Sequence, residues 1–237
     1  IIKFVSQIIF NMKFLKTLIL LFIVSSTIAQ TKQQLQHLDS YFQKSLNQWQ
    51  IPGMAIAIVT KDSIIFSKGY GFANIEKKQK VDVNTLFAVA SNSKAFTATS
   101  LAKLVEEGKL KWTDKVVDYL PYYKMYNDYV TNNTTIEDLL CHRNGLVTFS
   151  GDLLWYGTIK TSEEIITAQQ HLKPKYNFRT TYGYSNISYL VAGKIVEKIS
   201  EKSWQQYVSD NFLKPLEMNR TLTSTSQLNS TYNIATP

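Results

Sequence analysis

Two short segments of the chain carry side chains whose types and spacing could support nucleophilic catalysis. Ser91-Asn92-Ser93-Lys94 places a serine hydroxyl three residues before a lysine amine, at the start of a helical pattern. Residues three apart share one face of a helix, so the Lys94 amine can reach the Ser91 oxygen. A hydroxyl at a helix start also lies near unpaired backbone amides, which can stabilise a developing oxyanion. A lysine acts as the base in such a pair only when burial or a second cation lowers its pKa.

The second segment is Tyr184-Ser185-Asn186, about 90 residues further along the chain. Its phenol can relay protons, and its amide can orient a substrate carbonyl or a lysine. Taken alone, each segment has a structural alternative. Ser91 could cap a helix beside a solvated lysine, and Tyr184 could be a buried tyrosine next to an N-cap asparagine. The two motifs in this order and separation favour the catalytic interpretation.

The elements that must position these residues can be read from hydrophobic periodicity. Helical spacing predicts an amphipathic helix over residues 31–49. Met54–Val59 and Ser63–Ser67 are β-prone runs joined by a hairpin turn, and Gly69–Gly71 is expected to be a loop or bulge. Residues 147–183 are expected to be irregular. Further helices are expected over residues 93–107, 114–120, 136–141, 186–199 and 203–212, with Ser203 as an N-cap.

The N-terminal residues differ in character from the rest. Residues 12–29 read as a signal peptide, because two lysines precede a short apolar run and a small-residue cleavage site. Residues 1–11 are expected to lie upstream of the true start, and residues 30–237 to form one domain. The protein is therefore expected to be secreted or periplasmic, without a stable membrane span after cleavage. A retained membrane anchor is the alternative.

Composition narrows the classes of partner. The formal net charge is +8, but most lysines are scattered between acidic residues, and no nucleic-acid recognition module accompanies them. We therefore expect no nucleic-acid partner, while attraction to an acidic cell-surface polymer stays open. The single cysteine, Cys141, excludes an intramolecular disulfide framework. His37, His142 and His171 lack metal-ligand spacing, so neither a metal nor a cofactor is expected.

Three longer segments resemble the class C β-lactamase-like and penicillin-binding-protein-like serine hydrolases. They are Leu86–Leu104, Leu139–Leu146 (Leu-Leu-Cys-His-Arg-Asn-Gly-Leu) and Tyr182–Met218, and the similarity extends over most of residues 35–225. The resemblance implies an α+β fold in which helices flank an antiparallel sheet beside an all-α lobe. The motifs are specific to this superfamily but not to one substrate within it.

The resemblance also implies roles for the site residues. Ser91 would attack an amide or ester carbonyl, Lys94 and Tyr184 would shuttle the proton, and Asn186 would hold the substrate. The substrate could be a peptidoglycan-type D-amino-acid peptide, an ester or a β-lactam. The alternatives are a non-catalytic penicillin-binding or sensor protein on the same scaffold and a basic protein that binds the cell wall.

The sequence departs from the family pattern in one motif, which bears on whether the chain contains the whole domain. The third motif, Lys-Thr-Gly or His-x-Gly on a late strand facing the nucleophile, does not occur between Asn186 and Pro237. Two antiparallel strands also do not make a stable sheet alone. We therefore expect the chain to be a C-terminally truncated fragment that lacks strands of its sheet and is not by itself a competent enzyme.

Four further residues near the motifs have open or structural interpretations. His142 is expected to form a structural turn near the site and not to be a catalytic base. Cys141 is expected to be a buried small apolar residue. Trp155 and Tyr156 could equally line a substrate cleft or pack in the core.

Overall fold

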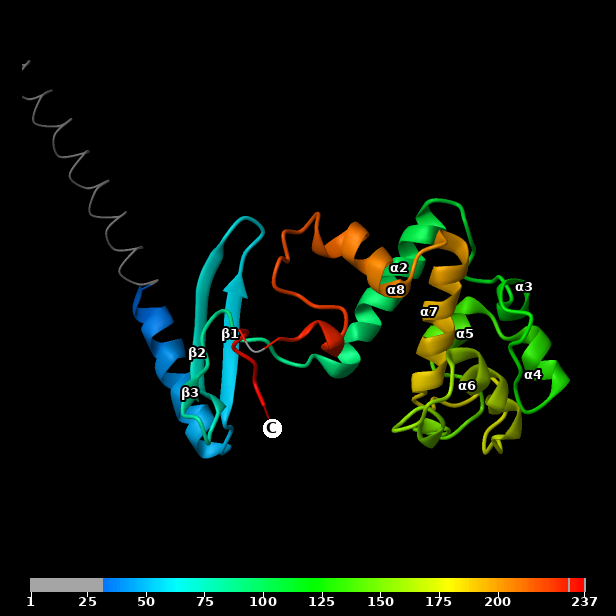
Figure 1. The fold of residues 1–237 in the computed structure, drawn as a ribbon, viewed down its shortest axis with the longest axis horizontal. Helices are drawn as coiled ribbons and strands as arrows, with labels where there is room; N and C mark the ends of the chain where they lie inside the picture. Colours follow the sequence, from blue (N-terminus) through cyan, green and yellow to red (C-terminus); the bar gives the residue numbers. More distant parts are fainter. Residues whose placement is uncertain (1–31, 230, 237) are drawn as a thin grey trace, which may run out of the picture. The chain divides into compact units, whose positions relative to one another are not determined.

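The computed structural model describes residues 32–229 and 231–236 (Figure 1). The predicted leader and signal peptide, residues 1–29, lie outside the described residues. The chain divides into two compact units. Unit 1 comprises Ile1–Phe87 with Asn229–Pro237, and unit 2 comprises Ala88–Leu228.

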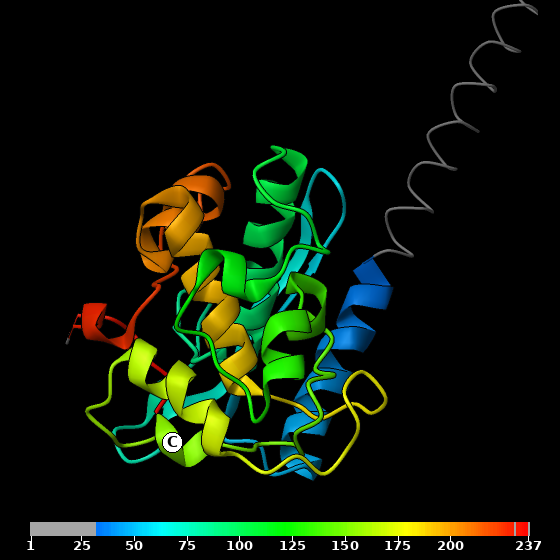
Figure 2. The ribbon, with the colours of Figure 1, turned by 90° about the vertical axis from the view of Figure 1, so that its right-hand side faces the viewer.

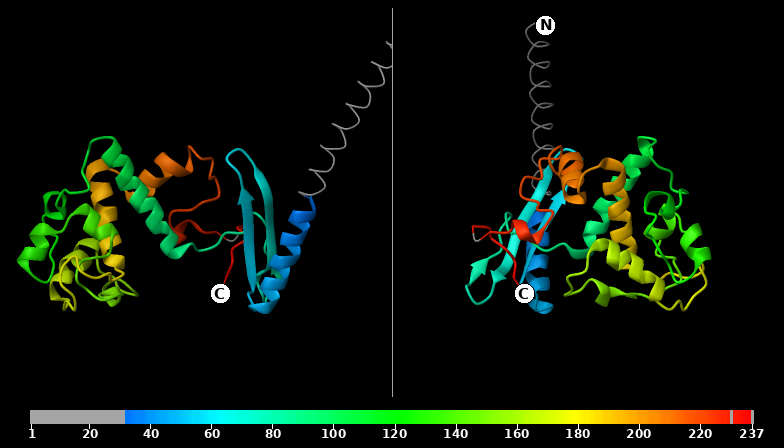
Figure 3. Two further views of the ribbon diagram at one scale, coloured as in Figure 1. Left: turned by 180° about the vertical axis from the view of Figure 1, so that it is seen from behind. Right: turned by 45° about the vertical axis from the view of Figure 1, so that its right-hand side comes forward.

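Unit 1 contains a helix over residues 32–48 and a sheet with the strand order β1-β2-β3. Strands β1 (Gly53–Val59) and β2 (Ile64–Asn74) pair antiparallel, and the short β3 (Gln79–Lys80) pairs with the far end of β2. The helix runs along the hairpin in both views of Figure 3. Its Phe42 ring lies 6.1 Å from the Tyr70 ring of β2. The predicted amphipathic helix is thus confirmed, and its Phe42 side chain packs against the hairpin.

The expectation of a loop or bulge at Gly69–Gly71 is wrong, because β2 continues through these residues to Asn74. Gly71 has φ +69°, and a Cβ there would lie 2.2 Å from the Pro52 carbonyl oxygen. The glycine therefore marks a close approach between backbones inside the sheet. A glycine in a strand pattern can indicate either a bulge or a close approach between backbones, and here it indicates the close approach.

The C-terminal residues of unit 1 contact the same sheet. Leu86 and Ile234 form a parallel bridge, and the Thr236 amide donates to the Ala73 carbonyl at 2.8 Å. These contacts join the two sequence segments that make up unit 1.

Unit 2 is helical, and all of residues 88–228 are described. Apart from one isolated bridge between Lys115 and Thr135, it contains no strand pairing. In chain order its α-helices are α2 (Ser93–Glu106), α3 (Val116–Tyr119), α4 (Asp128–Asn133), α5 (Ile136–Leu140), α6 (Ser162–Ala168), α7 (Asn186–Ser200) and α8 (Trp204–Val208).

Helix α7 lies at the centre of unit 2 and contacts α2, α3, α5, α6 and α8 (Figure 2). Its residues Ile187, Val191 and Ile195 recur every four positions and are almost fully buried. Leu101 and Leu104 of α2 belong to the same apolar core. Burying each such side chain contributes about 1.5–3 kcal/mol, so the packing of α2 and α7 is a main source of stability in this unit.

The sequence did not predict two short helices. Helix α6 lies in the segment 147–183, which was expected to be irregular, and α4 lies in a segment for which no element was expected. Helix α6 begins at a capping box, in which Thr161 accepts from the Glu164 amide and Glu164 accepts from the Thr161 amide. Helix α4 is capped by the Asn127 side chain, which accepts from the Val130 amide at 2.8 Å. Both helices are short, so the apolar periodicity that would reveal them is weak, whereas their capping residues are visible in the sequence.

The later helices follow the prediction with small differences. The prediction that Ser203 is an N-cap is confirmed, since its side chain accepts from the Gln206 amide. The expected helix over 203–212 divides into α8 and a π-helical turn, η4 (Ser209–Leu213).

The fold class is confirmed as α+β, with an antiparallel sheet and an all-helical unit. Within the described ranges, no helix combines the length and the apolar character that crossing a bilayer requires.

Candidate functional site

Ser91 lies in a single 3-10 turn, η1 (Ala90–Asn92), immediately before α2. Its neighbour Ala90 has φ +43°, a left-handed conformation that is costly for a residue with a Cβ. Backbone strain of this kind is concentrated at functional sites, where the surrounding structure maintains it. The turn leaves Ser91 exposed at the start of a 14-residue helix.

Both capping alternatives for the motif residues are wrong. The N-cap of α2 is Asn92, and no side chain forms a capping hydrogen bond there. The N-cap of α7 is Ser185, which accepts from the Ser188 amide. The side chains of Ser91 and Asn186 are therefore free for other contacts.

The four predicted site residues lie together. The Tyr184 hydroxyl donates to Ser91 Oγ at 2.6 Å, and Lys94 Nζ donates to the same oxygen at 3.2 Å. Lys94 Nζ also donates to Asn186 Oδ1 at 2.7 Å. Ser91 Oγ is thus within reach of both groups that could take its proton.

Two aromatic rings surround the lysine. Lys94 Nζ lies 4.5 Å from the centroid of the Tyr184 ring and 5.3 Å from that of Tyr189. A cation near ring faces is stabilised by the ring quadrupole. These contacts hold the half-buried Lys94 side chain beside the serine.

The Tyr184 phenol has a lowered pKa. Hydrogen bonding to Lys94 is the largest cause, followed by the hydrogen bond with Ser91, while partial burial opposes both. A cation beside a phenol favours the phenolate form. The arrangement therefore makes the phenolate form of Tyr184, which can accept a proton, easier to reach than in an isolated tyrosine.

The His142 side chain packs against Tyr184. Its ring stacks on the Tyr184 ring with centroids 4.7 Å apart, and its Nδ1 accepts from the Ser185 amide at 3.0 Å. Burial, with a smaller contribution from the charge of Lys94, lowers the pKa of His142. A neutral imidazole with Nδ1 as acceptor fits these contacts, in agreement with the expected structural role.

A buried carboxylate connects the two segments that lead into the site. The Asp138 side chain is fully buried and accepts from Arg143 Nε at 2.6 Å and from Arg179 Nη2 at 2.7 Å. Arg143 directly follows His142, and Arg179 precedes the Tyr184 segment. Burial would raise the pKa of Asp138, but hydrogen bonds from Arg179, the Thr135 amide and Arg143 outweigh it and lower the pKa.

Asp152 was missed by the sequence reasoning. Its Oδ2 accepts from Asn186 Nδ2 at 2.9 Å, and its Oδ1 accepts from Trp155 Nε1 at 3.2 Å. An acidic residue in an irregular segment has no distinguishing pattern in one sequence, so no signal was available to find it.

A cavity of about 480 Å³ lies beside the serine. Its lining consists of Ser91, Lys94 and Asn186 together with mainly apolar neighbours: Ala90, Ser93, Thr97, Trp155, Ser162, Ile165, Ile187, Tyr189 and Leu190. Trp155 thus lines a cavity and does not pack in the core, and Tyr156 is 72% exposed.

The expectation that Cys141 is buried is wrong, because α5 ends one residue earlier and leaves it exposed.

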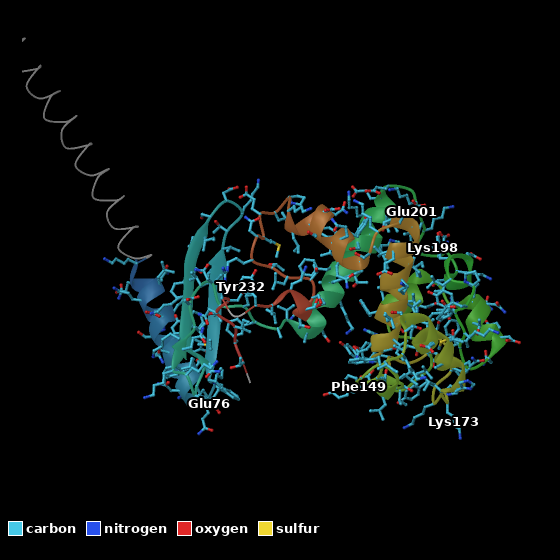
Figure 4. The ribbon with its side chains drawn as sticks, in the orientation of Figure 1. Glu76, Phe149, Lys173, Lys198, Glu201 and Tyr232 are labelled. Atoms are coloured by element: carbon cyan, nitrogen blue, oxygen red, sulfur yellow. The ribbon has the colours of Figure 1, made fainter. Side chains whose placement is uncertain are left out.

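The site lies at the N-terminal end of α7. Phe149, whose ring centroid is 5.5 Å from that of Tyr184, is labelled at this end in Figure 4, whereas Lys198 and Glu201 are labelled at the opposite end of the helix. Among the described side chains, no cluster of three or more His, Cys, Asp or Glu residues could hold a metal ion.

Comparison with known proteins gives a family match over most of the chain. The family model "Beta-lactamase" matches residues 38–237. Protein flp of Staphylococcus aureus (strain MW2) is 32% identical over 196 residues, which cover 81% of this chain and 39% of flp. Unguisins hydrolase ungD' of Aspergillus campestris is 32% identical over 210 residues, covering 83% of this chain and 39% of the relative. The chain thus spans about two fifths of the length of these relatives.

Solved structures agree with this match. The octameric penicillin-binding protein homologue from Pyrococcus abyssi superposes with a TM-score of 0.71 at 26% identity, covering 85% of this chain and 47% of that one. FmtA from Staphylococcus aureus superposes with a TM-score of 0.71 at 27% identity, covering 84% of this chain and 53% of that one.

Proposed function

The chain belongs to the Beta-lactamase family, and on this basis we propose that it carries the nucleophile of a serine hydrolase that works through an acyl-enzyme on Ser91. The observation that carries the proposal is the convergence on one oxygen atom. Tyr184 and Lys94 both contact Ser91 Oγ, at 2.6 and 3.2 Å. A nucleophilic serine with its base in hydrogen-bond reach, and with that base positioned by a further group, is the general pattern of covalent catalysis.

In the acylation step, Ser91 Oγ attacks the carbonyl carbon of an amide or ester. The serine proton passes to the Tyr184 oxygen, whose phenolate form the Lys94 ammonium favours. The tetrahedral intermediate then collapses, the bond to the leaving group breaks, and the leaving group takes the proton from Tyr184. The positive end of the α2 dipole lies at Ser91 and favours the oxyanion.

In the deacylation step, water attacks the ester on Ser91. Tyr184 takes a proton from the water and returns one to Ser91 Oγ as the acyl group leaves. Asn186 accepts from the Lys94 ammonium and thereby keeps the cation beside both oxygens. The cycle restores every group to its starting protonation state.

The proposed substrate is an amide or ester of the kind found in peptidoglycan D-amino-acid peptides, simple esters or β-lactams. The largely apolar cavity of about 480 Å³ beside Ser91 supports an acyl group with an apolar part. The name of one relative, a hydrolase of unguisins, supports hydrolysis as the type of reaction.

We further propose that the protein is exported and acts outside the cytoplasm, as a secreted or periplasmic protein. The support is the signal-peptide pattern over residues 12–29. Fractionation of the cells that make the protein tests it, because an uncleaved cytoplasmic product would contradict export.

The hydrolase proposal is tested with a chromogenic nitrophenyl ester and the full-length natural protein. We expect a stoichiometric burst of nitrophenol followed by steady turnover, both lost in Ser91→Ala. Ser40→Ala, which removes an exposed serine of unit 1, serves as the control and should behave as wild type. A burst without turnover would support the non-catalytic binding alternative, and unchanged turnover in Ser91→Ala would overturn the proposal.

A further inference from the structure

Asn186 is held between two groups of opposite hydrogen-bonding character. Its Oδ1 accepts from Lys94 Nζ at 2.7 Å, and its Nδ2 donates to Asp152 Oδ2 at 2.9 Å. An ammonium group only donates and a carboxylate only accepts, so the amide has one satisfactory orientation. Rotating it by 180° would set Nδ2 against the Lys94 ammonium and Oδ1 against the Asp152 carboxylate.

From this arrangement we infer that Asp152 is a positioning residue, which fixes the Asn186 amide so that its oxygen faces Lys94. The inference rests on the proposed function, because it concerns how the Lys94 cation is kept beside Ser91 and Tyr184. Asp152 touches none of the reacting atoms in this account and acts through Asn186 alone.

Asp152 is itself held in place on two sides. Its other oxygen accepts from Trp155 Nε1 at 3.2 Å, and Trp155 lines the cavity beside Ser91. The preceding backbone is tied to the site as well, since the Phe149 amide donates to the Tyr184 carbonyl at 2.8 Å and the Asp152 amide donates to the Phe149 carbonyl at 3.2 Å. The carboxylate therefore connects the cavity wall to the amide that contacts Lys94.

The carboxylate character of Asp152 is what its two partners require. Trp155 and Asn186 both present N–H donors, and an asparagine at position 152 would have only one oxygen to accept from them. If that oxygen faces Trp155, the new amide nitrogen faces Asn186 and favours the flipped Asn186 orientation. An exchange of the two residues would restore the pattern, because Asn186→Asp can accept from Lys94 and from an asparagine at position 152.

The test measures the burst rate of nitrophenyl ester acylation as a function of pH in the full-length protein. Asp152→Asn and Asp152→Ala should lower the plateau rate by about tenfold to a hundredfold, as losing a hydrogen-bonded partner behind a site ligand typically does. KM should change little, because Asp152 is not proposed to bind substrate. Hydrogen bonding to Lys94 is the largest cause of the lowered Tyr184 pKa, and the charge of Asp152 is the last of the opposing causes. Displacement of Lys94 in either variant should therefore move the Tyr184-dependent limb of the profile to higher pH.

Two further variants make the result decisive. Asp118→Asn removes an exposed carboxylate of α3 and should match wild type. The exchange variant Asp152→Asn/Asn186→Asp should be faster than either of its single variants, which general damage to the fold would not produce. An Asp152→Asn profile equal to that of Asp118→Asn, or an exchange variant slower than both single variants, would overturn the inference and leave the proposed function standing. A wild-type protein that shows no burst would overturn both.

Discussion

The Tyr184 hydroxyl donates a hydrogen bond to Ser91 Oγ at 2.6 Å, although the two residues are 93 positions apart in the sequence. Ser91 precedes α2 and Tyr184 precedes α7, and these two helices pack against each other. The short distance therefore depends on the apolar core of unit 2 as well as on the motif residues.

The first prediction concerns the phenol. Tyr184→Phe keeps a ring that can stack on His142 and lie beside Lys94, but removes the hydroxyl that contacts Ser91. We expect the acylation rate to fall by about 10²–10⁴-fold, the usual contribution of a general acid–base group, with unchanged circular dichroism. Tyr182→Phe is the control, since Tyr182 is 62% exposed. Equal loss of activity in both variants would contradict the assignment of Tyr184 as the relay.

The second prediction concerns the pH dependence of stability at His142. Because the folded-state pKa of His142 is lowered, the unfolded state binds more protons below about pH 6.5. The stability that the neutral ring provides is therefore complete above about pH 6.5, and is lost as pH falls towards the folded-state pKa. His142→Asn places an amide oxygen near the position of Nδ1 and cannot be protonated in this range.

Urea unfolding at about pH 7.5 and pH 5.5 measures this difference. Wild type should lose stability between the two conditions, and His142→Asn should lose less. His171→Asn, at an exposed position of the same unit, should keep the wild-type dependence. A His142→Asn protein with the full wild-type dependence would show that another group causes it.

The third prediction concerns the buried carboxylate. Asp138→Asn leaves Arg143 and Arg179 without their shared anion and should lower the free energy of unfolding by about 3 kcal/mol. This is the low end of the range for breaking a buried pair, because both guanidinium groups reach solvent. Glu137→Gln removes an exposed partner of Arg143 and should cost less than about 1 kcal/mol. Similar losses in the free energy of unfolding in the two variants would show that burial of Asp138 does not make its ion pairs more important to stability than the exposed pair.

The fourth prediction concerns the glycine before the tyrosine. A Cβ at Gly183 would lie 2.0 Å from the Leu146 carbonyl oxygen, so Gly183→Ala must displace the backbone that carries Tyr184. We expect loss of acylation together with a lower melting temperature. Gly193→Ala is the matched control, because a Cβ there meets only Trp204 at 3.6 Å and alanine favours the helix by about 1 kcal/mol. A Gly183→Ala protein with wild-type activity would show that the close approach can relax at no cost to the site.

The long elements could be predicted from the sequence because their periodicity is strong. Helix α7 begins and ends within a residue of its expected bounds, since Ile187, Val191 and Ile195 recur at helical spacing. Strand β2 was cut short because glycine is equally common in loops and at close contacts between strands. The short helices α4 and α6 were missed because capping, and not a long apolar stripe, defines them.

The four motif residues of the site were found for a different reason. The spacing within each motif is one helical turn for Ser91 and Lys94 and two positions for Tyr184 and Asn186, which a sequence displays directly. The role of Asp152 and the contacts that His142 makes with Tyr184 and Ser185 depend on the packing of separate segments, and no local pattern reveals them. The Ser185 amide reaches His142 Nδ1 only because the two segments lie side by side in the folded chain.

The measurement that tests the central claim most directly is the location of a covalent adduct. The full-length protein is treated with a fluorophosphonate probe, digested, and the modified peptide is sequenced by mass spectrometry. We predict one adduct per chain on Ser91, absent from Ser91→Ala. An adduct on another residue, or equal labelling of the Ser91→Ala protein, would contradict the account.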